Sequence, residues 1–202
     1  MPEEKGVALE ALSGVFMFSN RKFSICCAAV MAAVFLLSFL VPAALSDTAS
    51  GRIRNFGRVN QNLYRGGRPK AGDYEYLASL GIKCIVDLER GGEADEKKLV
   101  ESAGMRFYGI PMSDTCEPTK EQVAEFLKIV SDPKNQPLYL HCRAGRHRTG
   151  AMTAIYRIVH DGWTADRAYA EMKQYQFKRG TGHAALKKCV YEYSTSASRE
   201  KN

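Results

Sequence analysis

The sequence lacks the cysteine and histidine patterns that bind metals or build a disulfide framework. Its six cysteines contain no C-x2-C pair, and its four histidines contain no H-x3-H pair. Cys26 and Cys27 lie in an apolar segment, and Cys84, Cys116 and Cys189 have no paired short spacing. Zinc modules and disulfide-rich scaffolds depend on such spacings. We therefore expect no metal, no other cofactor and no disulfide framework.

The sequence also lacks internal repeats and any recognised nucleic-acid-binding motif. The formal net charge is +7, and residues 1–46 contribute nothing to it because three basic residues offset three acidic ones. The whole excess therefore lies on residues 47–202, which fits an anionic substrate or surface. Without a binding motif, charge alone does not indicate a nucleic-acid partner.

Charge is absent from Phe23 to Ser46, and most of that segment is apolar. Residues 1–22 form an N-terminal region that ends with the basic flank Arg21-Lys22, and Met17 is an alternative start. Residues 23–46 are long enough for a signal peptide or a membrane anchor, and they end in small residues at the spacing that a signal peptidase reads. We expect an exported protein of the periplasm or cell envelope, either cleaved or associated with the membrane through residues 23–45. A buried soluble helix is the alternative.

Residues 47–55 are interpreted as a linker and residues 56–196 as the folded domain. Short apolar runs alternate with helical patterns along this domain. Strands are expected near 62–65, 84–88, 106–110 and 138–140, and helices near 74–80, 93–102, 119–130, 148–160, 165–175 and 184–193, with a frayed tail from Ser194. This alternation predicts an α/β fold with a mostly parallel central sheet flanked by helices.

Ten residues, 141–150, contain most of the candidate catalytic and phosphate-binding groups. They read His-Cys-Arg-Ala-Gly-Arg-His-Arg-Thr-Gly and lie between a predicted strand and a predicted helix. A strand, a tight turn and a helix N-terminus place backbone N–H groups around one point, which suits a phosphate. Cys142 at that point would be stabilised as a thiolate. Arg148 would grip two phosphate oxygens with its planar fork, and the Thr149 hydroxyl would hydrogen-bond the cysteine sulfur.

These residues form the C-x5-R-[ST] signature, and the stretch resembles the protein tyrosine and dual-specificity phosphatase superfamily. The segments 63–69 and 80–88 resemble the opening of small bacterial tyrosine-phosphatase-like proteins, and 156–163 resembles the helix that follows their loop. The similarity covers about residues 56–180. The loop is also similar to atypical fungal and plant members with Gly-Lys-His-Arg-Thr-Gly, although Arg146 replaces their Lys.

The resemblance implies a phosphomonoester hydrolase that works through a phosphocysteine. Cys142 would be the nucleophile and Arg148 the phosphate clamp, while Thr149 would help the thiolate leave. In this family an aspartate some tens of residues before the cysteine is the general acid. Asp114, 28 residues before Cys142, fits that position, and Glu117 is the runner-up. His141 is expected to support the loop rather than to transfer protons.

The substrate-binding residues would be the loop residues between nucleophile and clamp, namely Arg143, Ala144, Gly145, Arg146 and His147. Arg143, Arg146 and His147 are expected to ring the phosphate with extra positive charge. Lipid-directed members carry Lys at the first two of these positions, and relatives that cut inositol pyrophosphates have Lys-His at the second and third. We expect phosphorylated protein as the main substrate. The similarity of the loop to lipid-directed and inositol-directed members leaves inositol polyphosphates or phosphoinositides as the alternative.

Two other function classes remain open at this point. A rhodanese-like sulfur transferase would not need Asp114 or the Arg148-Thr149 pair, and a non-catalytic phosphate-binding module would be expected to lack one of the catalytic residues. Some relatives protect the nucleophile by reversible pairing with a second cysteine. Cys84 would be the candidate partner of Cys142, although a small buried core residue is the favoured interpretation.

Overall fold

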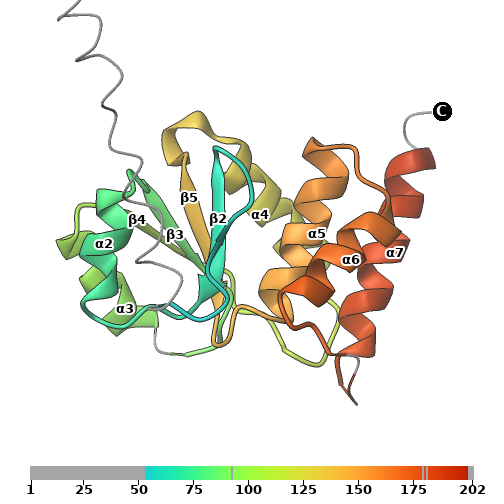
Figure 1. Cartoon of the computed structure of the whole chain (residues 1–202), viewed down its shortest axis with the longest axis horizontal. Helices are drawn as coiled ribbons and strands as arrows, with labels where there is room; N and C mark the ends of the chain where they lie inside the picture. The colour runs from blue at the N-terminus through green and yellow to red at the C-terminus, as the bar shows by residue number, and fades with distance from the viewer. Residues whose placement is uncertain (1–52, 92, 179, 181, 200–202) are drawn as a thin grey trace, which may run out of the picture. The chain divides into compact units, whose positions relative to one another are not determined.

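The computed structural model describes residues 53–91, 93–178, 180 and 182–199, which belong to one compact unit, Ser46–Asn202 (Figure 1). The predicted N-terminal region 1–22, the apolar segment 23–46 and most of the linker 47–55 lie outside the described residues. Among the helices described, none combines the length and apolar character needed to cross a membrane. Ile53, where the description starts, is 2% exposed and packs with Tyr74 and Leu77.

The centre of the domain is a five-stranded sheet in the order β1-β2-β5-β3-β4. The strands are β1 (Gly57–Arg58), β2 (Leu63–Gly67), β3 (Cys84–Asp87), β4 (Arg106–Gly109) and β5 (Leu138–Cys142). All neighbours pair in parallel except β1 and β2, which pair antiparallel. The predicted fold class, an α/β fold with a mostly parallel central sheet, is confirmed.

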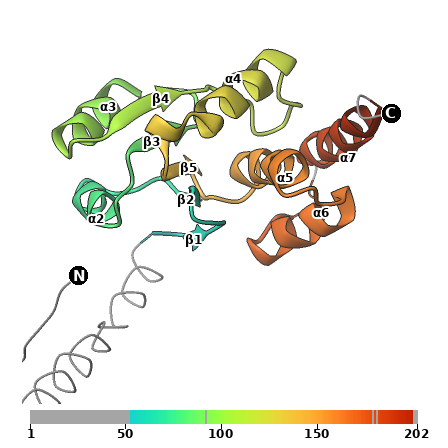
Figure 2. The same cartoon turned by 90° about the horizontal axis from the view of Figure 1, so that it is seen from above.

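Helices cover both faces of the sheet (Figures 1 and 2). The helices α2 (Asp73–Ser79) and α3 (Glu93–Ser102) pack on one face, in a core that contains Ile85 of β3 and Tyr139 of β5. On the other face, α4 (Lys120–Ser131), α5 (Arg148–His160), α6 (Ala165–Gln174) and α7 (Ala184–Arg199) share a larger core with Cys84, Val86, Leu138, Leu140 and Cys142. Successive residues of each buried strand therefore alternate between the two cores, as the two-residue period of a strand requires.

The helix boundaries follow local sequence signals. Thr119 caps α4 with a complete capping box to Gln122, and Thr164 caps α6 by accepting from the Arg167 N–H. A 3-10 turn, η1 (Pro133–Asn135), leads from α4 to β5. The helix α7 continues to Arg199, so the predicted frayed tail from Ser194 is wrong. Residues 194–199 include no Gly or Pro, the residues that break helices, so the helix can extend through them.

Candidate active site

The phosphate-loop residues connect β5 to α5 as the sequence predicts. The strand β5 ends at Cys142 and the helix α5 begins at Arg148, so Arg143–His147 form the turn between them. His147 occupies the N-cap position and makes no side-chain cap hydrogen bond. The first N–H groups of a helix need acceptors, and an anion at this end would supply them.

One pocket of about 230 Å³ brings the predicted catalytic groups together. Its lining comprises Asp114, Cys142, Arg143, Ala144, Arg146, His147, Arg148 and His183. Seven of these eight residues were predicted from the sequence, and they come from β5, the loop, the start of α5 and the segment after β4. Gly145 and Thr149 were also predicted as site residues, but they do not line the pocket. A nucleophile, a guanidinium and a carboxylate facing one cavity provide the parts for phosphoryl transfer.

Arg148 is held by backbone carbonyls next to the pocket. Its Nη1 donates to the Leu88 oxygen at 3.2 Å and to the Met112 oxygen at 3.4 Å. Its Nη2 lies 4.0 Å from a carboxylate oxygen of Glu89. These contacts orient the planar side chain before a substrate arrives, which lowers the cost of ordering it on binding.

Gly145 is the loop residue that packs against β2, at a position where only glycine fits. Its φ is +66°, and a Cβ at this position would overlap the backbone of Gly66, within 2.6 Å of the Gly66 carbonyl oxygen. The loop therefore packs directly against β2. Tyr139 Oη donates to the Gly67 oxygen at 2.6 Å and Asn55 Nδ2 to the Ala144 oxygen at 2.8 Å, which fixes both sides of this contact.

Asp114 and Glu117 have different surroundings, although both lie on the loop after β4. Asp114 lines the pocket with Cys142 and Arg148, whereas the Glu117 carboxylate accepts from Lys188 Nζ at 2.9 Å and does not line it. The geometry favours Asp114 over Glu117 for the general acid.

His183 is a pocket residue that the sequence did not single out. Its Nδ1 lies 2.9 Å from the Asp114 carbonyl oxygen, which accepts from it, and its ring stacks on His147 with centroids 3.5 Å apart. His183 thus joins the Asp114 loop to the phosphate loop. It precedes α7 by one residue and lies 41 residues after Cys142, so no local pattern marks it as part of the site.

His147 was predicted to add positive charge to the site, and this prediction is wrong. Burial, together with the neighbouring His183 and Arg146, lowers the pKa of His147 to about 4. The imidazole is therefore neutral at pH 7, and the extra positive charge around the pocket comes from Arg143 and Arg146.

The predicted hydrogen bond from Thr149 to the cysteine sulfur is not formed. Thr149 is fully buried in the first turn of α5, and its Oγ1 has no hydrogen-bond partner among the described residues. A buried hydroxyl without a partner costs free energy, and the thiolate form of Cys142 would be a stronger acceptor than the thiol.

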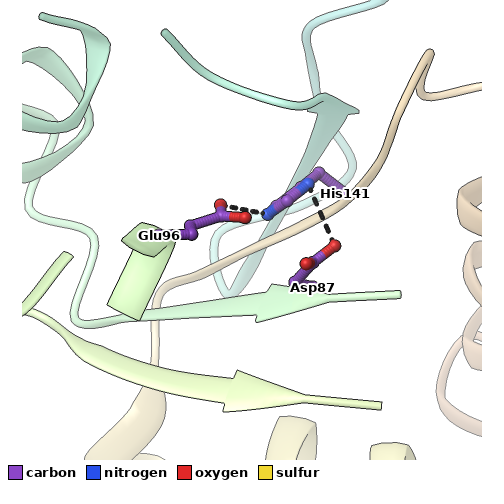
Figure 3. A group of neighbouring side chains, drawn as sticks. All are labelled: Asp87, Glu96 and His141. Atoms are coloured by element: carbon purple, nitrogen blue, oxygen red, sulfur yellow. Dashed lines mark ion pairs between the residues drawn. The ribbon is translucent and has the colours of Figure 1, made fainter. Parts of the chain in front are cut away.

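His141 lies beneath the loop in a cluster of buried charged groups (Figure 3). Its Nε2 is 2.8 Å from a Glu96 oxygen and its Nδ1 is 3.6 Å from an Asp87 oxygen. Arg68 lies 3.8 Å from Glu96 and 4.0 Å from Asp87, and Tyr74 donates to Glu96 at 3.0 Å. His141 is 0% exposed, so it has no access to a substrate.

The two carboxylates of this cluster respond differently to burial. Burial raises the pKa of Asp87 to about 6 despite the opposing effect of His141. Burial also acts to raise the pKa of Glu96, but hydrogen bonds from His141 and Tyr74 outweigh it, so that pKa is lowered. Candidate ligand atoms of Asp87, Glu96 and His141 all lie within 4.8 Å of one another, an arrangement that no sequence spacing indicated. Arg68 already places a positive charge against both carboxylates, which disfavours a cation there.

The structure favours the interpretation of Cys84 as a core residue over its pairing with Cys142. Cys84 lies opposite Leu138 in the register of β3 and β5. Cys142 is four residues further along β5, so at about 3.3 Å per residue the two Cα atoms are roughly 13 Å apart. A disulfide needs them within about 7 Å. Cys84 is a fully buried core residue, and burial raises the pKa of its thiol to about 12.

Comparison with known proteins assigns the family. Residues 44–188, most of the chain, match the family described as a DSP-PTPase phosphatase fused to NAD+ kinase, and the chain belongs to that family. The resemblance to tyrosine and dual-specificity phosphatases is thereby confirmed.

Sequence identity to individual relatives is low. Inositol diphosphatase DSP2 of Oryza sativa subsp. japonica is 29% identical over 126 residues, which cover 60% of this chain and 61% of that protein. Dual specificity protein phosphatase TpbA of Pseudomonas aeruginosa is 28% identical over 120 residues, which cover 59% of this chain and 54% of that protein. The chain thus spans about half to three fifths of the length of these relatives.

The fold matches a solved phosphatase structure. The core catalytic domain of the PP-IP phosphatase SIW14 from S. cerevisiae superposes with a TM-score of 0.63 at 24% identity, covering 74% of this chain and 94% of that one. At this identity the likeness establishes the fold.

Proposed function

We propose that this protein hydrolyses phosphomonoesters through a phosphocysteine intermediate at Cys142. The observation that supports the proposal is the pocket shared by Cys142, Arg148 and Asp114. The Cys142 sulfur attacks phosphorus and forms the S–P bond while the P–O bond to the leaving group breaks. Asp114 donates a proton to the departing oxygen.

The second step returns the enzyme to its starting state. Asp114, now a carboxylate, takes a proton from a water molecule that attacks the phosphocysteine, and the S–P bond breaks to release phosphate and the thiolate. In both steps Arg148 and the N–H groups of the loop bind the phosphoryl oxygens, which carry the negative charge of the transition state. The proposed mechanism therefore uses Cys142, Asp114 and Arg148 of the pocket, the N–H groups of the loop and one water molecule.

Phosphorylated protein, with phosphotyrosine or with dual specificity, is the first proposed substrate class. The family assignment and the relative named as a dual specificity protein phosphatase support it. A second candidate is an inositol polyphosphate or phosphoinositide. Arg143 and Arg146 line the pocket and offer positive charge for further phosphates, and one relative is named an inositol diphosphatase.

Turnover of p-nitrophenyl phosphate by the wild type and Cys142→Ser tests the reaction. The serine variant is expected to lose turnover and to keep binding phosphate esters, since the loop N–H groups remain. Substantial turnover by the folded serine variant would contradict the covalent mechanism. A panel of phosphopeptides and inositol phosphates then separates the two substrate classes by kcat/KM.

We also propose that the protein is exported, on the basis of the uncharged segment from Phe23 to Ser46. Fractionation of cells that express the full chain, with N-terminal sequencing, tests this. Recovery in the envelope, as a form starting near Asp47 or as an anchored chain, is expected. A cytosolic chain with its N-terminus intact would contradict the proposal.

A further inference from the structure

Arg65 is a fully buried arginine that contacts the back of the phosphate loop. It is 0% exposed, and its Nη2 donates to the Gly145 carbonyl oxygen at 2.6 Å. The guanidinium lies over the Tyr175 ring, with Cζ 3.9 Å from the ring centroid. Its Nε and Nη1 have no hydrogen-bond partner among the described residues.

No carboxylate of the described residues forms an ion pair with Arg65. The acidic side chain with the largest electrostatic effect on it, Glu171, is bound by Arg157, whose Nη2 lies 2.7 Å from a Glu171 oxygen. Burial lowers the pKa of Arg65 to about 10, against the opposing effects of Tyr175, Glu171 and Cys142. The guanidinium therefore stays charged at pH 7, and a buried charge without a counter-ion destabilises the fold.

The strand register places this charge on the same face of the sheet as Cys142. Leu63 shares the larger core with Leu138 and Cys142, and Arg65 follows Leu63 by two residues on β2. Arg65 pairs with Leu140 in the parallel register, so it lies beside β5 just before the loop. It does not line the pocket, in contrast to Arg148.

We propose that Arg65 is a positioning residue whose buried positive charge stabilises the anion at the phosphate loop, first the Cys142 thiolate and then the phosphoryl group. The second half of this inference rests on the proposed phosphatase function. Arg65 acts from behind the loop, through its contact with Gly145 and through its charge. Arg143, Arg146 and Arg148 add positive charge from the pocket side, Asp114 opposes them, and His147 is neutral at pH 7.

A set of three variants separates the charge of Arg65 from its structural contact. Arg65→Gln keeps a donor for the Gly145 oxygen and removes the charge, whereas Arg65→Lys keeps the charge. Arg157→Gln is the control, because Arg157 also has a largely covered guanidinium, 12% exposed and over the Trp163 ring at 4.2 Å, but it pairs with Glu171 and Asp161. All three are first checked for folding by thermal denaturation.

The readout is the rate of Cys142 alkylation by iodoacetamide across pH, followed by mass spectrometry of the Cys142 peptide. The midpoint of the profile is expected to move up by about one pH unit in Arg65→Gln, which lowers the rate about tenfold at a fixed pH below the midpoint. Arg65→Lys is expected to keep most of the wild-type profile. Arg157→Gln is expected to melt earlier with an unchanged profile.

Two outcomes would overturn the proposal. One is a folded Arg65→Gln variant with the wild-type alkylation profile. The other, which decides the matter if Arg65→Gln does not fold, is a folded Arg65→Lys variant whose profile has shifted by a full unit. Alkylation requires no turnover, so the test of Arg65 stands even if Cys142→Ser retains activity and the phosphatase mechanism fails.

Discussion

His141 and Cys142 are consecutive residues at the end of β5, yet they meet opposite environments on the two sides of the sheet. Cys142 faces a pocket lined by three arginines and one aspartate. His141 faces a cluster in which its ring contacts Asp87 and Glu96, and Arg68 contacts the same two carboxylates and Glu89. The first environment has spare positive charge and hydrogen-bond donors for an anion, whereas the second is internally paired. The same strand end thus serves binding on one face and stability on the other.

Replacing Arg148 with Lys tests the pocket side most severely. Lysine retains the charge but loses the planar fork that binds two phosphate oxygens. We expect kcat/KM for p-nitrophenyl phosphate to fall by about 10²–10³-fold, in the range seen when a transition-state donor is removed. Arg143→Lys, at the exposed rim, is the control and is expected to change the rate only a few-fold. Equal effects of the two variants would argue against Arg148 as the clamp.

Asp114→Asn is expected to slow hydrolysis of a phosphotyrosine peptide by about 100-fold or more, because tyrosine is a poor leaving group that needs a proton. The loss is expected to be smaller for p-nitrophenyl phosphate, whose leaving group needs little protonation. Glu117→Gln removes a neighbouring carboxylate that pairs with Lys188 and is expected to leave both rates near wild type. Equal losses on both substrates in Asp114→Asn would assign Asp114 a structural role.

Glu96→Gln probes the His141 side of the comparison. It removes the carboxylate that lies 2.8 Å from the buried His141 ring, while Arg68 keeps its contact with Glu89. Breaking a buried pair in this way is expected to cost about 3 kcal/mol in the free energy of unfolding. The kcat of the folded fraction is expected to stay within a few-fold of wild type. Glu101→Gln, on the same helix α3 but in an exposed pair with Lys97, is the control and is expected to cost less than about 0.5 kcal/mol. A large loss of kcat in Glu96→Gln without a loss of stability would mean that the cluster around His141 takes part in catalysis.

The smallest expected effect concerns pH and His147. Its folded-state pKa of about 4 lies below the ordinary value of 6.5, so the unfolded chain binds the proton more readily between these values. Stability from this group is therefore present above pH 6.5 and is lost as the pH falls toward 4. His147→Gln is expected to reduce the fall in Tm between pH 7 and pH 5 by a few degrees. An unchanged fall would show that His147 titrates normally; Asp87, whose raised pKa acts in the opposite direction over that range, remains in both proteins.

The sequence predicted the parts of this molecule that depend on local patterns. The Thr119 capping box, the Thr164 cap and the loop from Cys142 to Arg148 all lie where local signals placed them. The contacts that hold the loop were not predicted, because they join segments far apart in the chain. Arg65 reaches Gly145 across 80 positions, and His183 reaches Asp114 across 69.

Some of these contacts require particular residues, and the reason for those residues is visible only in the structure. Gly145 has no room for a side chain because its Cβ would overlap the backbone of Gly66, and a Cβ on Gly66 would overlap the hydroxyl of Tyr139. The candidate pairing of Cys84 with Cys142, which the sequence did not favour, could only be excluded with the register in hand. Strand adjacency alone does not give the register, and the register places Cys84 at the far end of β5.

The central claim is that Cys142, and no other pocket residue, carries the phosphoryl group during turnover. The most direct test is mass spectrometry of enzyme quenched during turnover of p-nitrophenyl phosphate, with mapping of the phosphorylated residue. Asp114→Asn is the best variant for this, because removal of the base slows hydrolysis of the intermediate while p-nitrophenol still leaves. We expect phosphate on the sulfur of Cys142. Phosphate on His147 or His183, or hydrolysis without any phosphoenzyme, would contradict it.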